Sequence, residues 1–549
     1  MPLGAVNRAL RGVKLGALGS AADLPFNLKT LAQAGVIGPK HPRELAAIAG
    51  AMRGWGPTPA GGITSAARSR PDVVGVIDDA GEATFGELHL ASNALARALR
   101  SEGVGEGDSV AVMCRNHRGF AEAIFACAKL GATTLLMNTD FARPQLAGVL
   151  EREKPKVLIH DAEFTELLVG AHEGLTRVVA WVDEGQTVDA LTVRELAESH
   201  SNADLEPPSS PGRFVVLTSG TTGLPKGAQR GSPTSLGPVA ILLSKMPLRS
   251  GRSIHVAAPM FHSWGFLHFS LGLALGSTFV LRRRFTPEGM LAAVAEHRTD
   301  ALAAVPVMLQ RVMELPEETR AAHDLSGLRV TAVSGSALPG DLATRWMDAF
   351  GDNLYNLYGS TEVAWATIAT PEDMRAAPGT AGRVPHGTVV KILDEAGGDV
   401  PQGQTGRIFV GSEMTFEGYT GGGDKEHIEG LLSSGDVGHF DSGERLFVDG
   451  RDDEMIVSGG ENVFPAEVED LIASHPDVVE AAAVGVDDET FGQVLWAFVV
   501  LREQGALDER DVREFVKSNL ASFKAPRQVK FMAELPRNAT GKILKRALS

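Results

Sequence analysis

Short apolar runs alternate with amphipathic helical segments along much of the chain. Apolar residues share one helical face over 88–99, and Thr84 followed by Glu87 predicts a capping box at the start of this helix. The apolar run 109–114 then predicts a buried strand. The same helix-to-strand alternation recurs over residues 119–137, 145–159 and 287–306. This order of elements predicts an α/β fold in which helices cover parallel sheets.

The pattern changes in the last part of the chain. After Gly435, short strand-like runs and turns replace the long helices, up to the polar segment 449–454. Near the other end, a turn-rich segment at 54–62 separates the first part of the chain from the large domain. The later elements predicted are helices over 466–475 and 509–520 and strands over 481–486 and 494–501. The predicted domains are a basic arm at 1–60, a large domain at 61–450 and a small α+β domain at 451–549.

Composition excludes several classes of protein. The chain has 549 residues, of which 44% are hydrophobic and 22% are charged, as is typical of a globular enzyme with more than one domain. The net charge of -16 leaves no basic excess to neutralise a nucleic acid, so we expect no such partner. The two cysteines, Cys114 and Cys127, are too few for a disulfide framework or a zinc site. Because no long apolar run occurs, we expect a cytoplasmic protein that does not span a membrane.

Residues 1–53 differ from the rest of the chain in charge. Their only acidic residues are Asp23 and Glu44. Their seven basic residues are Arg8, Arg11, Lys14, Lys29, Lys40, Arg43 and Arg53. One interpretation is a helical arm that folds onto the main domain. The other is a helix that rests on anionic lipid, with peripheral membrane contact through residues 1–53.

The stretch 217–227, LTSGTTGLPKG, combines glycines, hydroxyls and a lysine directly after an apolar run. Backbone N–H groups of glycines, hydroxyls and an ammonium are the donors that bind a phosphate. The stretch is not a Walker A loop, because Pro225 replaces the last glycine of that motif and Gly227 follows Lys226 where Ser or Thr is required. We therefore predict a phosphate loop of another class.

Four further stretches carry reactive groups: 358–362 (YGSTE), 434–438 (SGDVG), 450–453 (GRDD) and Lys542 in a polar C-terminal segment. In this order, together with the phosphate loop, they resemble the adenylate-forming superfamily of acyl-CoA synthetases, nonribosomal-peptide adenylation domains and luciferases. The resemblance covers roughly residues 60–549. It implies that a carboxylate attacks the α-phosphate of ATP to give an acyl-adenylate and pyrophosphate, after which a thiol displaces AMP.

The resemblance also implies the architecture. It implies a large N-terminal domain of doubly wound sheets with a small β-barrel-like subdomain, followed by a small mobile α+β domain. The cofactors implied are ATP, Mg²⁺ and coenzyme A.

For the nucleotide, the resemblance implies a role for each matching residue. The residues expected around the β- and γ-phosphates are Thr218, Ser219, Gly220, Thr221, Thr222, Gly223 and Lys226. The residues expected at the adenine are Gly335, Ser336, Ala337, Tyr358 and Gly359, although Ser334-Gly-Ser-Ala departs from the commoner Gly-Gly-Ala-Pro form. Thr361 would donate to the α-phosphate and Glu362 would help to bind Mg²⁺. Asp436 would accept both ribose hydroxyls, supported by Arg451.

The second domain would supply the remaining groups. By the same resemblance, Lys542 would bridge the attacking carboxylate and the α-phosphate. Asp453 would be the hinge whose torsions let the small domain present either Lys542 or its thiol-binding face. Gly459 and Gly460 would line the pantetheine channel.

The segment 258–266 corresponds to the entry of the acyl pocket in this superfamily. Members that activate amino acids have an aspartate where this chain has His262, so an amino-acid substrate is not expected. We expect His262 and Trp264 to line the route to an apolar tail, and the glycines in 269–276 to leave room for an alkyl chain. The prediction is a ligase for a medium- to long-chain fatty acid. The alternatives are an aryl-acid CoA ligase, a fatty-acyl-AMP ligase that loads a carrier protein, and a non-catalytic binding paralogue.

Overall fold

The computed structural model describes most of the chain. The described residues are 22–38, 42–170, 174–218, 226–230, 235–412, 414, 416–420, 425–452, 456–458, 461–488, 492–520, 524–538 and 541–548. The chain divides into two compact units, each of which is described by itself below. Unit 1 comprises Met1–Val333 and Glu413–Asp424, and unit 2 comprises Ser334–Ser412 and Lys425–Ser549.

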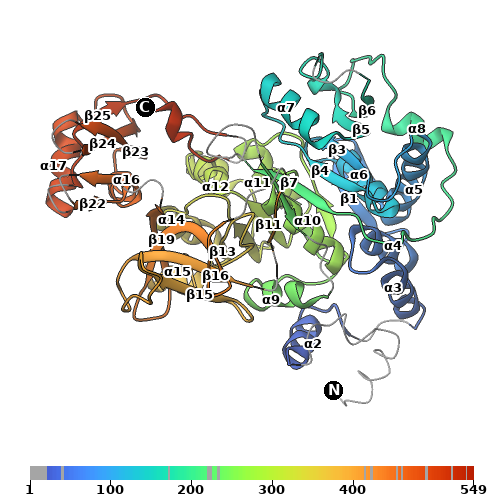
Figure 1. Cartoon of the computed structure of the whole chain (residues 1–549), viewed down its shortest axis with the longest axis horizontal. Helices are drawn as coiled ribbons and strands as arrows, with labels where there is room; N and C mark the ends of the chain where they lie inside the picture. Colours follow the sequence, from blue (N-terminus) through green and yellow to red (C-terminus); the bar gives the residue numbers. More distant parts are fainter. Residues whose placement is uncertain are drawn as a thin grey trace. The chain divides into compact units, whose positions relative to one another are not determined.

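A seven-stranded sheet lies in unit 1 (Figure 1). Its strands in spatial order are β17 (Phe416–Tyr419), β8 (Lys226–Arg230), β7 (Phe214–Thr218), β4 (Thr133–Leu136), β3 (Ser109–Met113), β5 (Val157–Asp161) and β6 (Thr176–Trp181). The pairs from β7 to β6 are parallel, whereas β8 pairs antiparallel with both β7 and β17. Most of this sheet is therefore the parallel type that the helix-to-strand alternation predicts.

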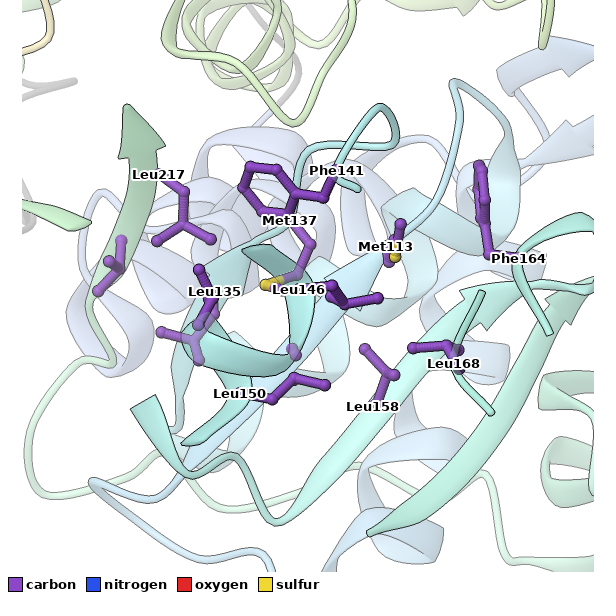
Figure 2. Close-up of a cluster of buried hydrophobic side chains, with 13 residues drawn as sticks. Met113, Leu135, Met137, Phe141, Leu146, Leu150, Leu158, Phe164, Leu168 and Leu217 are labelled. Carbon is purple, nitrogen blue, oxygen red and sulfur yellow. The ribbon is translucent and has the colours of Figure 1, made fainter. Parts of the chain in front are cut away.

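One face of this sheet packs against the helix α7 (Arg143–Glu153). Figure 2 shows the apolar side chains of strands β3, β4, β5 and β7 meeting Leu146 and Leu150 of α7. Phe141, which precedes α7, and Phe164, which follows β5, belong to the same cluster. Since all these side chains are almost fully buried, this cluster is a continuous core for the first half of unit 1.

A second set of strands in unit 1 is also mainly parallel. Its order is β12 (Val330–Val333), β11 (Ala301–Ala304), β9 (Ser253–Val256), β10 (Thr278–Val280), β1 (Val74–Asp78) and β2 (Gly81–Thr84). The pairs from β12 to β1 are parallel, and β2 pairs antiparallel with β1. The carboxyl ends of β9 and β11 therefore lie at the same edge of the sheet.

The helices around these sheets belong to unit 1 as well. They are α2 (Leu24–Gln33), α3 (Pro42–Trp55), α4 (Pro59–Ser69), α5 (Phe85–Ser101), α6 (Arg118–Leu130), α8 (Val193–Ser199), α9 (Gly237–Lys245), α10 (Ser263–Leu275), α11 (Pro287–Glu296), α12 (Pro306–Met313), α13 (Glu317–Ala321) and the short 3₁₀ helix η2 (Ala162–Phe164). The predicted capping box is confirmed at α5, where the Thr84 hydroxyl accepts from the Glu87 N–H at 3.2 Å. The Glu87 carboxylate in turn accepts from the Thr84 N–H at 2.8 Å.

The described part of the N-terminal arm folds onto unit 1. Helix α2 packs against α9, and Leu31 of α2 is fully buried. The N–H of Ser250 donates to the carbonyl of Ala34 at 2.8 Å, which fixes the end of α2. Residues 22–38 therefore fit the first interpretation of this segment, an arm folded onto the main domain. Residues 1–21 lie outside the described residues.

Unit 2 contains a short hairpin and two five-stranded sheets. The hairpin is β13 (Leu354–Tyr358) with β14 (Thr367–Ala369), and its helices are α14 (Gly340–Phe350) and α15 (Pro371–Ala376). The first sheet has the order β15 (Val389–Leu393), β16 (Gly406–Gly411), β19 (Leu431–Phe440) and β18 (His427–Ile428), with β20 (Leu446–Arg451) paired to β19. The second has the order β22 (Glu461–Val463), β21 (Ile456–Ser458), β24 (Gly492–Leu501) and β23 (Val478–Asp488), with β25 (Gln528–Phe531) paired to β24.

The C-terminal elements agree with the sequence prediction. Helices α16 (Pro465–Ala473) and α17 (Glu509–Asn519) pack with strands β23 and β24 around one apolar core, and the 3₁₀ helix η5 (Lys545–Ala547) follows. The α/β class, with a small C-terminal α+β domain, is confirmed. The boundaries at residues 60 and 450 remain predictions. Among the described residues, no helix is both long and apolar enough to cross a membrane.

Candidate active site

A largely enclosed carboxylate forms the centre of the candidate site in unit 2. Asp436 lies in β19, opposite Arg451 at the end of β20, and its side chain is 15% exposed. The hydroxyl of Tyr358, the last residue of β13, donates to Asp436 Oδ2 at 2.5 Å. A guanidinium nitrogen of Arg451 lies 3.4 Å from Asp436 Oδ1. The structure thus brings together three residues that the sequence assigned to the nucleotide.

Two further residues that the sequence prediction did not assign hold the backbone that carries this carboxylate. The Ser434 hydroxyl accepts from the Asp436 N–H at 3.1 Å and donates to the carbonyl of Ile408 at 3.0 Å. The ammonium of Lys425 donates to the Ser434 carbonyl at 2.9 Å. Ser434 begins the quoted SGDVG stretch, so its signal was present, whereas nothing in the local sequence of Lys425 indicated this position.

Burial and charge act in opposite directions at the centre of the site. Burial raises the pKa of Asp436, while the Tyr358 hydrogen bond and the positive charges of Arg451, Lys425 and Lys542 lower it, and the net result is a raised pKa. Burial, together with the charge of Asp436, raises the pKa of Tyr358 well above its usual value, so its hydroxyl stays a donor. The carboxylate is therefore held by donors in place of water.

Lys542 lies within electrostatic range of Asp436, since its charge lowers the pKa of that carboxyl. Its side chain is exposed. Its backbone is fixed by two contacts with Asn538: the Lys542 N–H donates to Asn538 Oδ1 at 2.9 Å, and the Asn538 N–H donates to the Lys542 carbonyl at 3.0 Å. This turn presents the lysine at a defined place in unit 2.

The turn at residues 358–362 is held by its own serine. The Ser360 hydroxyl donates to Glu362 Oε2 at 2.9 Å and accepts from the Glu362 N–H at 3.2 Å. A side chain at Gly359 would place its Cβ 2.2 Å from the Ala364 carbonyl oxygen, so only glycine fits. Thr361 and Glu362 are half-buried on this turn, and a carboxylate oxygen is a ligand suited to Mg²⁺.

The other predicted nucleotide residues are only partly covered by the description. Gly335 and Ala337 are exposed, Ser336 is half-buried, and Gly335 has a φ of +96°. The residues predicted in the phosphate loop, at the hinge and at the pantetheine channel that lie outside the described residues are Ser219, Gly220, Thr221, Thr222, Gly223, Asp453, Gly459 and Gly460. Thr218 and Lys226 are described by their backbones, which pair across β7 and β8.

The predicted substrate segment lies in unit 1, between the carboxyl end of β9 and helix α10. His262 is the N-cap residue of α10, and Trp264 is 6% exposed in its first turn. The Trp264 indole N–H donates at 2.8 Å to the carbonyl of Ala304, the last residue of β11. Both residues therefore lie where parallel strands end, which is the usual ligand-binding edge of such sheets.

Asn116, which the sequence analysis did not single out, fixes this segment. Its amide nitrogen donates to the carbonyls of Val256 and Ala258, both at 2.9 Å, and its amide oxygen accepts from the Met260 N–H at 2.8 Å. The side chain is 5% exposed. An asparagine two residues after the buried strand 109–114 was a visible signal, but its partners lie about 140 residues away in the chain.

The glycines of α10 do not leave room for an alkyl chain. A Cβ on Gly272 would lie 2.5 Å from the Phe279 ring, so this glycine lets the helix pack closely on strand β10. Gly276 ends the helix in the left-handed conformation, with a φ of +61°, and its carbonyl accepts from Arg70 at 3.0 Å. The interpretation of these two glycines as space for a fatty-acid tail is wrong, because packing and helix termination require them.

The motifs and the fold agree with comparison to known proteins. The chain belongs to the AMP-binding enzyme family: the model of the AMP-binding enzyme matches residues 63–420, and that of its C-terminal domain matches residues 467–542. Within this family it is an adenylate-forming acid–thiol ligase of the acyl-CoA synthetase type.

Three relatives illustrate the similarity. Feruloyl-CoA synthase of an Amycolatopsis species is 33% identical over 490 residues, which are 87% of this chain and 96% of that protein. Indoleacetate–CoA ligase of Aromatoleum aromaticum is 32% identical over 459 residues, 82% of this chain and 89% of that protein. The crystal structure of the anthranilate CoA ligase AuaEII with anthranoyl-AMP superposes with a TM-score of 0.81 at 25% identity, covering 89% of this chain and 96% of that one.

The raised pKa of Asp436 predicts a pH-dependent effect of its removal. Because the folded protein holds this proton more tightly than the unfolded chain, whose Asp pKa is near 3.8, Asp436 costs stability as the pH rises through this range. The difference in Tm between Asp436→Asn and the wild type should therefore move in favour of the variant as the pH rises above the unfolded-state pKa of 3.8, and it should level off once Asp436 is ionised in the folded protein as well. Thermal unfolding at each pH measures it, with the exposed Asp399→Asn as the control. A difference that stays constant with pH would contradict the assignment.

The Asn116 contacts predict a selective loss. In Asn116→Ala, three buried backbone groups lose their partner, so the 256–260 segment should loosen and kcat/KM for the acid should fall about 10- to 100-fold. In Asn116→Asp, a carboxylate oxygen would face two carbonyls, so the loss should be at least as large. KM for ATP should change less than threefold in both variants. Steady-state kinetics with each substrate varied separately measures this, and equal losses for ATP and acid would instead indicate general destabilisation.

Proposed function

We propose that this protein joins an aromatic carboxylic acid to coenzyme A, with ATP as the activating substrate and an acyl-adenylate as the intermediate. The observation that carries the proposal is the packing of the substrate segment. Aromatic and imidazole side chains of 261–268 lie against the ends of β9 and β11, and the nearby glycines are used by the core. A short planar slot fits this arrangement better than a long tunnel.

The relatives support the same substrate class. Their names refer to ferulate, indoleacetate and anthranilate, which are all carboxylic acids with an aromatic ring. The chemistry of His262 adds to this. Burial lowers its pKa to about 4, so it is neutral at physiological pH and offers no charge partner to an ammonium. A neutral imidazole beside the Phe261 ring suits a neutral aromatic ring.

The first half-reaction needs the nucleotide to be held and charge on the α-phosphate to be stabilised. We assign the two ribose hydroxyls to the carboxylate of Asp436, which Tyr358 and Arg451 hold in place. Thr361 donates to the α-phosphate. Glu362 would hold Mg²⁺ through its carboxylate, and the ion supplies positive charge to the phosphate oxygens.

Lys542 provides a further positive charge for this step. Its ammonium donates to the attacking carboxylate of the acid and to an α-phosphate oxygen, so that like charges approach each other without full repulsion. The carboxylate oxygen forms a bond to the α-phosphorus, and the bond to the leaving pyrophosphate breaks. In the second step the thiol of coenzyme A attacks the acyl carbon and AMP leaves.

The competing substrate class is a medium- to long-chain fatty acid, transferred to coenzyme A or to a carrier protein. The two classes differ in how kcat/KM depends on the acid. An alkyl tunnel gains up to about 0.8 kcal/mol for each methylene that it buries, so kcat/KM rises with chain length until the tunnel is full. A planar slot accepts a ring and rejects long chains.

A panel of acids tests the proposal. Thioester formation with ATP and coenzyme A should be at least about tenfold more efficient, in kcat/KM, for the best of benzoate, phenylacetate, cinnamate and indoleacetate than for octanoate, dodecanoate or hexadecanoate. A 3-cyclohexylpropanoate and 3-phenylpropanoate pair controls for size, since only the second has a planar ring. If dodecanoate is the best substrate, the aromatic assignment is wrong although the ligase class stands.

A further inference from the structure

Two imidazoles at the start of helix α10 each have a buried nitrogen with no partner. Over the part of the chain that the structure describes, the buried imidazole nitrogens without a hydrogen-bond partner are Nε2 of His262 and Nε2 of His268. A buried polar atom left unpaired costs about 1–3 kcal/mol, so an imidazole nitrogen without a partner calls for an explanation, of which a bound ligand is one. Both histidines flank the first turn and a half of α10.

His268 has a defined tautomer. Its Nδ1 lies 3.2 Å from the carbonyl oxygen of Trp264, one turn earlier in α10. A carbonyl oxygen only accepts, so Nδ1 carries the proton and donates. Burial lowers the pKa of His268 to about 4, so the ring is neutral and carries no second proton. Nε2 is therefore a lone pair that can accept a hydrogen bond and cannot donate one.

The position of this lone pair is fixed by its surroundings. His268 is 1% exposed, and its ring meets the Trp264 ring edge-to-face with centroids 4.2 Å apart. Trp264 is itself tied to the end of β11 through its indole N–H. The imidazole thus belongs to the same rigid group of side chains that lies at the carboxyl ends of the parallel strands.

Ordinary core packing does not account for this residue. A leucine at position 268 would pack in an apolar helix at no polar cost, whereas histidine leaves an acceptor unpaired. His255 provides the contrast within the same unit. It is equally buried, and its Nδ1 pairs with the Val280 carbonyl at 2.8 Å, but its Nε2 is not among the unpaired buried atoms.

We propose that Nε2 of His268 accepts a hydrogen bond from a hydroxyl or amino group on the ring of the acid. The inference rests on the proposed function and names its substrate class more narrowly: an aromatic acid that carries a hydrogen-bond donor on the ring. An acceptor-only site discriminates between a hydroxyl group and a methoxy group at the same ring position. Only the hydroxyl supplies the missing proton.

The test compares matched acids and matched variants. Pyrophosphate release is measured for 2-, 3- and 4-hydroxycinnamate, the corresponding methoxycinnamates, the aminobenzoates, cinnamate and benzoate. In the wild type, one donor-bearing acid should exceed its methoxy or unsubstituted counterpart by about tenfold or more in kcat/KM. His268→Leu should reduce this ratio to about one to three, and His268→Gln should retain most of it, because its amide oxygen reaches a similar place. His255→Leu, which removes a buried imidazole of a different kind, should leave the ratio as it is.

Thermal unfolding supplies a second readout. The Tm of His268→Leu without ligand should equal or exceed that of the wild type, because the variant removes an unpaired buried acceptor. The inference is overturned if no donor-bearing ring is preferred in the wild type, or if His268→Leu and His255→Leu change the ratio equally. Aromatic turnover without a preference that depends on His268 overturns this inference alone. If no aromatic acid reacts at all, the proposed function falls together with it.

Discussion

A carboxylate that is buried before its ligand arrives has to be held by neighbouring donors, and Asp436 shows how this chain meets that requirement. Burial raises the pKa of this group, and the Tyr358 hydroxyl and the Arg451 charge oppose the shift. Ser434 receives the backbone N–H of Asp436 and is itself fixed to β16 through the Ile408 carbonyl. Under the proposed function, these contacts set the acceptor in position before the nucleotide binds, which limits the reorganisation that binding requires. Because Tyr358 and Arg451 both contact Asp436, the stretches 358–362, 434–438 and 450–453 have to meet in unit 2.

Two buried polar side chains in unit 1, Asn116 and His268, differ in whether their polar atoms are all hydrogen-bonded. At Asn116, every side-chain polar atom has a backbone partner, so the residue serves to position the segment from 256 to 260. At His268, one nitrogen is paired and the other is not. A fully paired group stabilises a fold, whereas an unpaired one in the same apolar surroundings provides a place for a ligand. Under the proposed function, this contrast separates Asn116, which positions the segment, from His268, which contacts the acid.

Local signals in the sequence predicted the elements well. The Thr84 capping box, the strand at 109–113 and the C-terminal helices depend on residues close together in the chain, and the structure contains all of them. Contacts between distant segments could not be predicted in this way. The partners of Asn116 lie about 140 residues away, and Gly272 could be understood only once Phe279 was seen against it. Glycine in an apolar helix permits either an open tunnel or close packing, and only the neighbouring strand decides between them.

The central claim is that a charged lysine of the C-terminal segment acts on the formation of an acyl-adenylate. The most direct measurement separates the two half-reactions in Lys542→Ala, with the exposed Lys517→Ala as the control. Pyrophosphate release from ATP and a good acid should fall about a hundred- to a thousandfold, which corresponds to a lost contact of about 3–4 kcal/mol in the transition state. Thioester formation from supplied acyl-AMP and coenzyme A should stay within about threefold of the wild type. Equal loss in both half-reactions, or unchanged pyrophosphate release, would contradict the account.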